Sequence, residues 1–306
     1  RSSDRGGLGQ GVERVNGPRR NDRDGGLSVD VLEEWVAEAE GQPLFIWLHL
    51  FDAHSPYGAP APHDGTYWDG PRPFDEQAPP LLPERLIPYF LTGLTDVDYP
   101  YQQYRGEVDY VDVQMGRVLA LDRMDSAVIA FTADHGESFG EHGVWWDHAD
   151  LYPQTVHIPL ILSWPGGPQG LRNTELVRQI DVGRTLLDLA HLELEAFPGR
   201  NLGWALEEFP AADALFELSA HGNVACVHTS RWRLSVHLRD HHEAALAEPR
   251  KKHEVEFYDL QTDPQCNQNL AREQAHFAQA QRMRSQLIEW LAAAHPTGWG
   301  GGQALT

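Results

Sequence analysis

The sequence is poor in cysteine, lysine and long apolar runs. Its 306 residues include only two cysteines, Cys226 and Cys266, which form no C-x-x-C pair and therefore fix no redox compartment. No apolar stretch reaches the length of a membrane-spanning helix, which excludes a span in this chain. Lysine occurs only at Lys251 and Lys252, and the formal net charge is -21. Because nucleic-acid binding needs a basic surface, this charge argues against nucleic acid as a partner.

The remaining composition is that of a globular protein. Hydrophobic residues make up 41% of the chain, and there are ten tryptophans. This length and composition allow one large α/β domain with a buried core and a small satellite domain. An acidic surface repels anionic substrates at long range, so any anion-binding site must be locally positive, through a metal ion or a few arginines and histidines.

One apolar run leads into a loop that is rich in reactive side chains. Residues 127–132 are short, apolar and β-branched, which predicts a buried strand, and Gly136 and Gly140 interrupt regular structure after it. The polar residues that follow the strand are Asp134, His135, Glu137, Glu141, His142, Asp147 and His148. A single histidine in a loop is usually solvated or hydrogen-bonded. Here the density of metal-capable and proton-transferring groups predicts an active-site loop.

A second apolar run ends in a similar way. Residues 44–50 read as a strand, and Asp52 and His54 follow it before a Pro-Tyr turn. Adjacent parallel strands present their ends at the same sheet edge. We therefore expect His54 to converge with Asp134, His135 and His148 in one pocket. The proline-rich residues 58–88 read as a surface excursion that shapes a substrate entrance.

Helical and strand patterns alternate through the first two thirds of the chain. Ser28 is a plausible N-cap for a helix that Gly41 ends, and a strand at 156–163 precedes a helix at 181–189. The apolar stripe expected to face the core of a further helix is Tyr104, Val108, Val111, Met115 and Val118. This alternation predicts an α/β fold with a mainly parallel, doubly wound sheet.

The pattern changes after about residue 205. Short β-like runs follow at 214–218, 224–228, 231–238 and 257–260, and a last helix is marked by apolar residues from Phe277 to Leu291. The predicted domains are a tail or connector at 1–26, a partial α/β domain at 27–205, and a small antiparallel sheet-plus-helix subdomain at 206–306. The tail has too little apolar content to fold alone, and the Gly-rich end from Gly298 is expected to fray.

Several stretches together resemble the sulfatase branch of the alkaline-phosphatase superfamily. They are Phe-Asp-Ala-His-Ser-Pro-Tyr at 51–57, Tyr-Arg-Gly-Glu-Val-Asp-Tyr-Val-Asp at 104–112, Thr-Ala-Asp-His-Gly-Glu at 132–137, Gly-Glu-His-Gly at 140–143, Leu-Tyr at 151–152, His-Ile-Pro-Leu-Ile at 157–161, Asp-Val-Gly-Arg-Thr-Leu-Leu-Asp-Leu at 181–189, and Phe-Tyr-Asp-Leu-Gln-Thr-Asp-Pro with Asn-Leu at 257–270. The number and order of these motifs make the resemblance specific.

The resemblance implies a metal-dependent hydrolase of sulfate monoesters. It implies that Asp134 and His135 are ligands of a divalent metal, usually calcium, and that the metal polarises the substrate anion. By the same resemblance His54 contacts the sulfate or protonates the leaving oxygen, and His148 occupies the place of a sulfate-binding lysine. The implied partner is a sulfated small molecule or glycan, and the implied location is periplasmic or secreted.

The motif that carries the family's nucleophile is missing. In relatives the nucleophile is a formylglycine made from Cys or Ser in a Cys/Ser-x-Pro-Ser/Ala-x-Arg motif, or an unmodified Ser or Thr in related branches. It lies in their N-terminal half with two further metal aspartates. The nearest match here, at Ser163, lacks the small residue and the arginine. We therefore expect a C-terminal fragment of a sulfatase that is inactive alone. Two alternatives stay open. One is a phosphate or phosphonate monoester hydrolase of the same superfamily, because imidazole suits Mn or Zn better than calcium. The other is a non-catalytic metal- or glycan-binding module.

Overall fold

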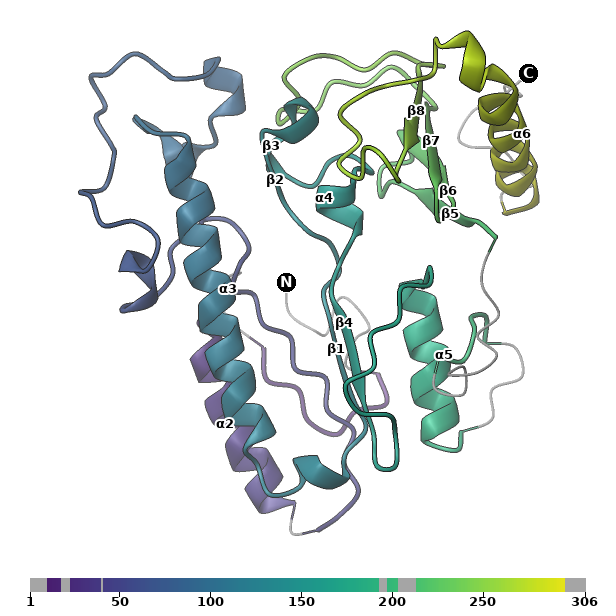
Figure 1. Ribbon diagram of the computed structural model, residues 1–306. Helices are drawn as coiled ribbons and strands as arrows, with labels where there is room; N and C mark the ends of the chain where they lie inside the picture. Colours follow the sequence, from purple (N-terminus) through teal and green to yellow (C-terminus); the bar gives the residue numbers. More distant parts are fainter. Residues whose placement is uncertain (1–9, 18–22, 40, 193–196, 203–212, 295–306) are drawn as a thin grey trace. The chain divides into compact units, whose positions relative to one another are not determined.

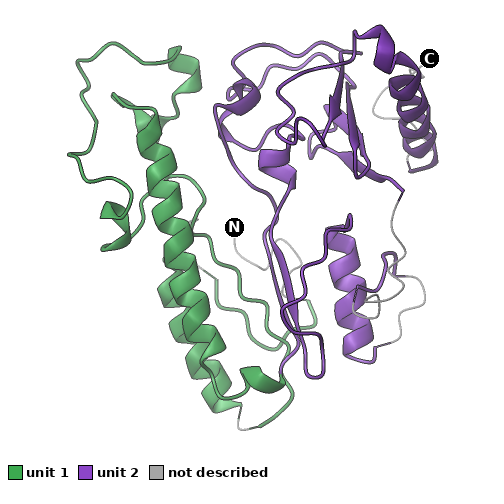
Figure 2. Ribbon diagram, viewed as in Figure 1, with its two compact units in different colours: residues 1–126 green, residues 127–306 purple. Residues whose placement is uncertain are grey.

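The computed structural model describes residues 10–17, 23–39, 41–192, 197–202 and 213–294. The chain falls into two compact units, residues 1–126 and residues 127–306, which Figure 2 colours separately. Helices and strands both occur in it, so this is a mixed α/β protein. Residues 1–9 and 18–22 of the predicted tail, and the Gly-rich end from Gly298, lie outside the described residues.

Two packed helices form the centre of the first unit (Figure 1). Its helical elements are α2 (Gly25–Glu38), α3 (Asp98–Leu119) and the short 3-10 helices η1 (His63–Gly65), η2 (Glu84–Leu86), η3 (Tyr89–Leu91) and η4 (Met124–Ser126). Val29, Leu32 and Val36 of α2 pack with Val118 of α3. The N-cap of α2 is Asp24, whose carboxylate accepts from the Leu27 amide, so the helix begins before the predicted Ser28 and includes the end of the predicted tail.

The buried face of α3 is more polar than the sequence pattern indicated. Of the predicted apolar stripe only Val118 is fully buried, and Val108 is 45% exposed. The side chains of Gln103, Glu107 and Gln114 are buried instead. They can be buried because the helix packs against loop backbone rather than only against apolar side chains: Gln103 Nε2 donates to the Asp64 carbonyl of η1 at 2.9 Å. The predicted core stripe is therefore wrong at Val108 and confirmed at Val118, and its other three residues are partly buried.

Residues 44–50 do not form a strand. They run without a ladder partner among the described residues, and Phe45 and Trp47 are 75% and 73% exposed. A strand needs a neighbour to accept and donate its backbone hydrogen bonds. The described residues therefore leave much of this apolar run uncovered.

The second unit opens with strands that pair antiparallel. β1 (Ile129–Thr132) pairs with β4 (Leu160–Ser163), with Thr132 opposite Leu160. Between them lie the hairpin of β2 (Ser138–Phe139) and β3 (Trp145–Asp147), the 3-10 turn η5 (Glu141–Gly143) and the helix α4 (Pro153–Val156).

This pairing corrects the predicted sheet. A parallel pair needs a crossover that returns the chain to the first end of the strand, usually through a long helix, and the four-residue α4 does not provide one. Every strand pair among the described residues is antiparallel. The mainly parallel, doubly wound sheet is therefore wrong for this part of the chain.

The remaining elements are a helix and a four-stranded sheet. They are α5 (Gln179–Leu189), β5 (Leu215–Leu218), β6 (Val224–His228), β7 (Trp232–His237), β8 (Val255–Asp259), η6 (Gln274–His276) and α6 (Phe277–Ala294). The strands pair antiparallel in the order β5-β6-β7-β8. Val227, Leu234 and Phe257 pack with Met283 and Leu287 of α6, which lies against one face of the sheet (Figure 1).

Candidate active site

The loop after β1 presents Asp134 and His135 in a fixed arrangement. The His135 amide donates to Asp134 Oδ1 at 3.0 Å, which holds the carboxylate over the start of the loop. His135 Nδ1 lies 2.8 Å from the Gly136 carbonyl oxygen. A carbonyl can only accept, so Nδ1 carries the proton and, in the neutral ring, Nε2 is the nitrogen that can act as a ligand.

Asp134 and His135 are spaced as two neighbouring metal ligands would be. Asp134 Oδ2 lies 3.7 Å from His135 Nε2. Two atoms that each lie about 2.0–2.6 Å from one cation are about 3–4 Å apart when they occupy adjacent coordination positions. Among the described residues no group of three or more His, Cys, Asp or Glu side chains is arranged to hold a metal ion. These two residues therefore fit part of a coordination shell and do not complete one.

Backbone contacts fix the path of this loop. The Gly136 amide donates to the Thr155 carbonyl at 2.8 Å, and Gln179 Nε2 of α5 donates to the Ala133 carbonyl at 2.7 Å. A Cβ added at Gly136 would lie 2.0 Å from the Gln154 carbonyl oxygen, so only glycine fits there. The close approach of two backbone segments explains why glycine must follow the Asp-His pair.

The hairpin of β2 and β3 carries His148 back to His135. The two imidazole rings stack with centroids 3.6 Å apart and an interplanar angle of 21°. The His148 amide donates to Asp147 Oδ1 at 2.6 Å, which repeats the backbone arrangement of Asp134 and His135. His148 Nδ1 lies 3.7 Å from Oε1 of Glu137, whose side chain is only 6% exposed. Pairing with this carboxylate raises the pKa of His148 above its ordinary value.

Glu137 was not among the residues predicted to act in the site. It lies in the Asp-His-Gly-Glu stretch, two residues after His135, and the sequence showed it only as one more acidic loop residue. Its burial against His148 depends on the hairpin, which the sequence pattern did not reveal. The structure thus joins Asp134, His135, Glu137 and His148 into one cluster, named the histidine cluster below.

His142, also on this loop, has structural contacts. Its ring stacks on Tyr152 at 3.8 Å between centroids, and its Nε2 donates to the Gln265 carbonyl at 3.0 Å. Arg250 donates to the His142 carbonyl at 2.7 Å. Burial lowers the pKa of His142, so its neutral form is favoured. These contacts tie the loop to the C-terminal residues.

His54 belongs to the first unit. Its Nδ1 lies 2.7 Å from the Ser55 carbonyl oxygen, the same relation that His135 has to Gly136, so Nδ1 is again the donor. Its ring stacks on Phe51 with centroids 4.5 Å apart. The histidine cluster lies in the second unit. The predicted convergence of His54 with Asp134 therefore stays a prediction.

A buried polar network lies between the loop and the C-terminal sheet. Tyr152 donates to the Glu256 carboxylate at 2.9 Å, and Arg250 Nε lies 3.5 Å from Asp150 Oδ2. Its other members are His237 and His241, whose Nδ1 and Nε2 atoms are 3.1 Å apart, and Glu243. No periodic pattern in the sequence predicts this network, because its members come from separate loops and strands.

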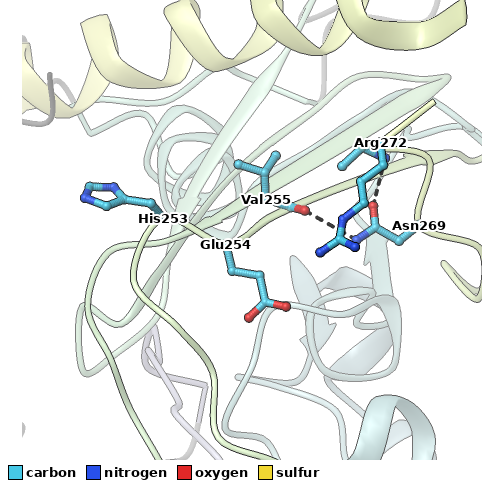
Figure 3. Close-up of a pocket in the computed structure, with 6 residues that line it drawn as sticks. His253, Glu254, Val255, Asn269 and Arg272 are labelled. Atoms are coloured by element: carbon cyan, nitrogen blue, oxygen red, sulfur yellow. Dashed lines mark hydrogen bonds between the residues drawn. The ribbon is translucent and has the colours of Figure 1, made fainter. Parts of the chain in front are cut away.

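Figure 3 shows a hollow whose lining includes no residue of the histidine cluster. It has a volume of about 490 Å³ and is lined by residues that include Glu254, Asn269 and Arg272. Asn269 Oδ1 accepts from the Phe257 amide in the middle of β8 and from the Ala271 amide, so its side chain binds backbone. Acidic and basic side chains both line the hollow, and we assign no function to it.

Comparison with known proteins identifies the family. A sequence model of the family described as Sulfatase matches residues 13–192. The chain is 26% identical over 215 residues to an N-acetylglucosamine-6-O-sulfatase of Bacteroides thetaiotaomicron, covering 65% of this chain and 37% of the relative. It is 45% identical over 87 residues to human iduronate 2-sulfatase, covering 26% of this chain and 15% of the relative. The matched part of the chain therefore covers between 15% and 37% of the length of these two relatives.

Solved structures show the same fold. A phosphonate monoester hydrolase from Silicibacter pomeroyi matches with a TM-score of 0.67 at 23% identity, covering 92% of this chain and 62% of that one. A phosphonate monoester hydrolase of Agrobacterium radiobacter matches with a TM-score of 0.64 at 21% identity, covering 87% and 60%. No described helix is both long and apolar enough to cross a membrane. The family match covers more than half of the chain, and the chain belongs to the sulfatase family.

Proposed function

We propose that this chain supplies the sulfate-binding loop and part of the metal site of an enzyme that hydrolyses sulfate monoesters. The observation that carries the proposal is the histidine cluster, in which an Asp-His pair and a second histidine meet on one loop. The sulfatase family match includes this loop. The proposed domains are an α/β part at 27–205, a C-terminal subdomain at 206–306, and a tail or connector at 1–26.

Asp134 and His135 would hold a divalent metal. The metal, when bound, would polarise the sulfate oxygens and stabilise the charge that develops during hydrolysis. Calcium is the first choice because the family resemblance implies it, and manganese or zinc is the alternative because imidazole is a nitrogen ligand. The Gly136 carbonyl orients the His135 ring so that Nε2, rather than Nδ1, is the ligand atom.

His148 and His54 would act on the substrate. Glu137 favours the protonated form of His148, which gives the locally positive group that an anion site on an acidic chain needs. His54 has its Nδ1 proton engaged by Ser55, so Nε2 is the atom that would exchange a proton with the leaving oxygen. The described residues of this chain thus bind the anion and move a proton.

Neither cysteine of the chain is an activated nucleophile. Cys226 and Cys266 are fully buried, and burial raises the pKa of each thiol to about 12. A thiol of this kind is neutral near pH 7 and does not attack. We therefore propose that this chain alone has no sulfatase turnover, and an assay with a chromogenic aryl sulfate measures this directly.

A second candidate is a phosphonate or phosphate monoester hydrolase. The imidazole of His135 as a metal ligand supports it, and the fold neighbours include two phosphonate monoester hydrolases. The organic part of the substrate is proposed to be a sugar, because a relative matched here is named an N-acetylglucosamine-6-O-sulfatase. A sulfate monoester and a phosphonate monoester of the same alcohol, compared by calorimetry on this chain, separate the two candidates.

The test of the proposed role of His148 uses binding rather than turnover. We expect 4-nitrophenyl sulfate to bind the purified chain, His148→Ala to weaken binding by about tenfold or more, and His148→Lys to restore it, because an ammonium is also a cation that donates to an oxyanion. His221→Ala is the matched control, since that side chain is 74% exposed in the same unit. Equal binding by the wild type and His148→Ala would refute the role of His148.

The metal assignment has its own measurement. With two ligands from this chain and water in the other positions, calcium binding should be weak. Tight, stoichiometric calcium binding in a calorimetric titration would show that other residues supply the missing oxygens.

A further inference from the structure

The turn that carries His54 rests on a buried acid of α3. The Gly58 amide donates to Glu107 Oε1 at 3.0 Å, which ties the end of the turn to the helix. Glu107 is only 7% exposed, and its second oxygen, Oε2, has no hydrogen-bond partner among the described residues. A carboxylate in such a place lacks the solvation that a charge requires. The motif at 104–112 contains this residue, and no proposed step uses it.

A second carboxyl lies within electrostatic reach. Asp52, two residues before His54, acts on Glu107 by charge, and its own Oδ2 lacks a hydrogen-bond partner among the described residues. A Cβ added at Gly25 would lie 2.5 Å from Asp52 Oδ2, so the N-terminus of α2 closes this side of the carboxyl. Each carboxyl therefore has one buried oxygen without a hydrogen-bond partner among the described residues.

The groups that face the pair do not neutralise it. The groups that act on Asp52 are the Gly25 amide, its own amide and the charge of Asp24. Asp24 in turn accepts a hydrogen bond from the Tyr110 hydroxyl at 2.7 Å, and Glu107 accepts one from the Gly58 amide. Three amides and one further acid, Asp24, include no positive charge that could balance two carboxylates in a buried space. Burial, with the charge of Asp52 as a smaller cause, raises the pKa of Glu107 to about 8.

We propose that Glu107 is a positioning residue for His54: its buried carboxyl accepts from the Gly58 amide as a neutral acid and so keeps the turn at 51–58 in place. When this proton leaves, two like charges repel in a buried site, and both belong to groups that anchor the turn. His54 then loses its position. The catalytic role of His54 rests on the proposed function. The protonation of Glu107 is independent of the proposed function.

The first arm of the test measures stability against pH. Glu107 holds its proton in the folded state up to about pH 8 but loses it near 4.5 when unfolded. The folded state therefore binds the extra proton between these values, and the unfolding constant of the wild type should rise with pH there by up to about tenfold per unit, then level off. Glu107→Gln keeps the acceptor for Gly58 without the charge and should remove this rise. Glu34→Gln, on the exposed face of α2, is the matched control and should keep it.

The second arm follows His54 itself by NMR. In the wild type the chemical shift of the His54 Cε1–H signal should change near pH 8, where Glu107 loses its proton. Glu107→Gln should abolish this change. Glu107→Ala, which removes the acceptor for Gly58, should displace the signal at every pH, and Glu107→Gln should restore it. An unfolding constant with the same pH slope in the wild type and in Glu107→Gln overturns the inference. A slope difference without any His54 change overturns the positioning role alone and leaves the proposed sulfate site to its own binding test.

Discussion

Residues 44–50 and residues 127–132 are both short apolar runs that lead to an aspartate and a histidine, yet only the second contributes a strand. The turns after them are alike, because His54 and His135 each donate from Nδ1 to the carbonyl of the next residue. β1 finds a partner in β4 within this chain, whereas residues 44–50 find none among the described residues. Local sequence therefore determines the conformation of the turn, whereas a strand forms only where a second segment pairs with it.

The largest expected change in unfolding free energy comes from substituting the glycine that packs at each turn. Gly136 lies in the turn after β1, and Gly25 of α2 lies against Asp52. A Cβ at Gly136 meets the Gln154 backbone at 2.0 Å, while one at Gly25 meets the Asp52 side chain at 2.5 Å. Backbone cannot yield and a side chain can rotate, so Gly136→Ala should cost about 3 kcal/mol of unfolding free energy and Gly25→Ala about 1 kcal/mol. Urea unfolding measures both.

Gly116→Ala is the control for these substitutions, because nothing lies within 4 Å of its added Cβ. As a glycine inside α3 it should gain about 0.5–1 kcal/mol when replaced by alanine. If Gly136→Ala were as stable as the wild type, the loop after β1 would not follow the path described here.

Each unit has a titratable group whose pKa burial shifts, upward for Glu107 in the first unit and downward for His241 in the second. Burial lowers the pKa of His241, so the folded state takes up its proton less readily than the unfolded state. Stability from this group is complete above about pH 6.5 and is lost as the pH falls below that value. The groups that face His241 are Asp150, His237, Glu243 and Arg250.

His241→Asn should therefore reduce the loss of stability between pH 6.5 and 5, while costing about 1 kcal/mol at pH 7.5 through the lost bond to His237. This pH slope is opposite in sign to that expected for Glu107 in the first unit. His221→Asn, at an exposed position of the second unit, is the control. Identical acid sensitivity of His241→Asn and the wild type would contradict the assignment.

The smallest expected effect concerns the apolar run itself. Trp47 is 73% exposed, so Trp47→Ser should change the unfolding free energy by less than about 0.5 kcal/mol. The same substitution should reduce self-association, because it removes exposed apolar surface. Phe131→Ser in β1, where the ring is half-buried, should cost more stability. Sedimentation velocity and urea unfolding together test this. A large loss of stability in Trp47→Ser would show that residues 44–50 are packed after all.

The sequence predicted local features better than long-range ones. The strand β6 and the start of the last helix at Phe277 were placed at the right residues, since their apolar periodicity is strong. The Asp134–His135 pair was found because a β-branched run ends in reactive groups. The parallel sheet was wrong because strand direction depends on which segments become neighbours. Glu107 escaped notice because a single buried acid has no periodic signature.

We propose that His54 and His148 bind the same sulfate. The most direct measurement is an NMR titration of the whole chain with 4-nitrophenyl sulfate, following the Cε1–H signals of His54, His148 and His221. We expect the His54 and His148 signals to shift with one common Kd while the signal of His221, which is 74% exposed, does not move. A His148 signal that shifts while His54 stays unchanged, or different Kd values for the two signals, would contradict it.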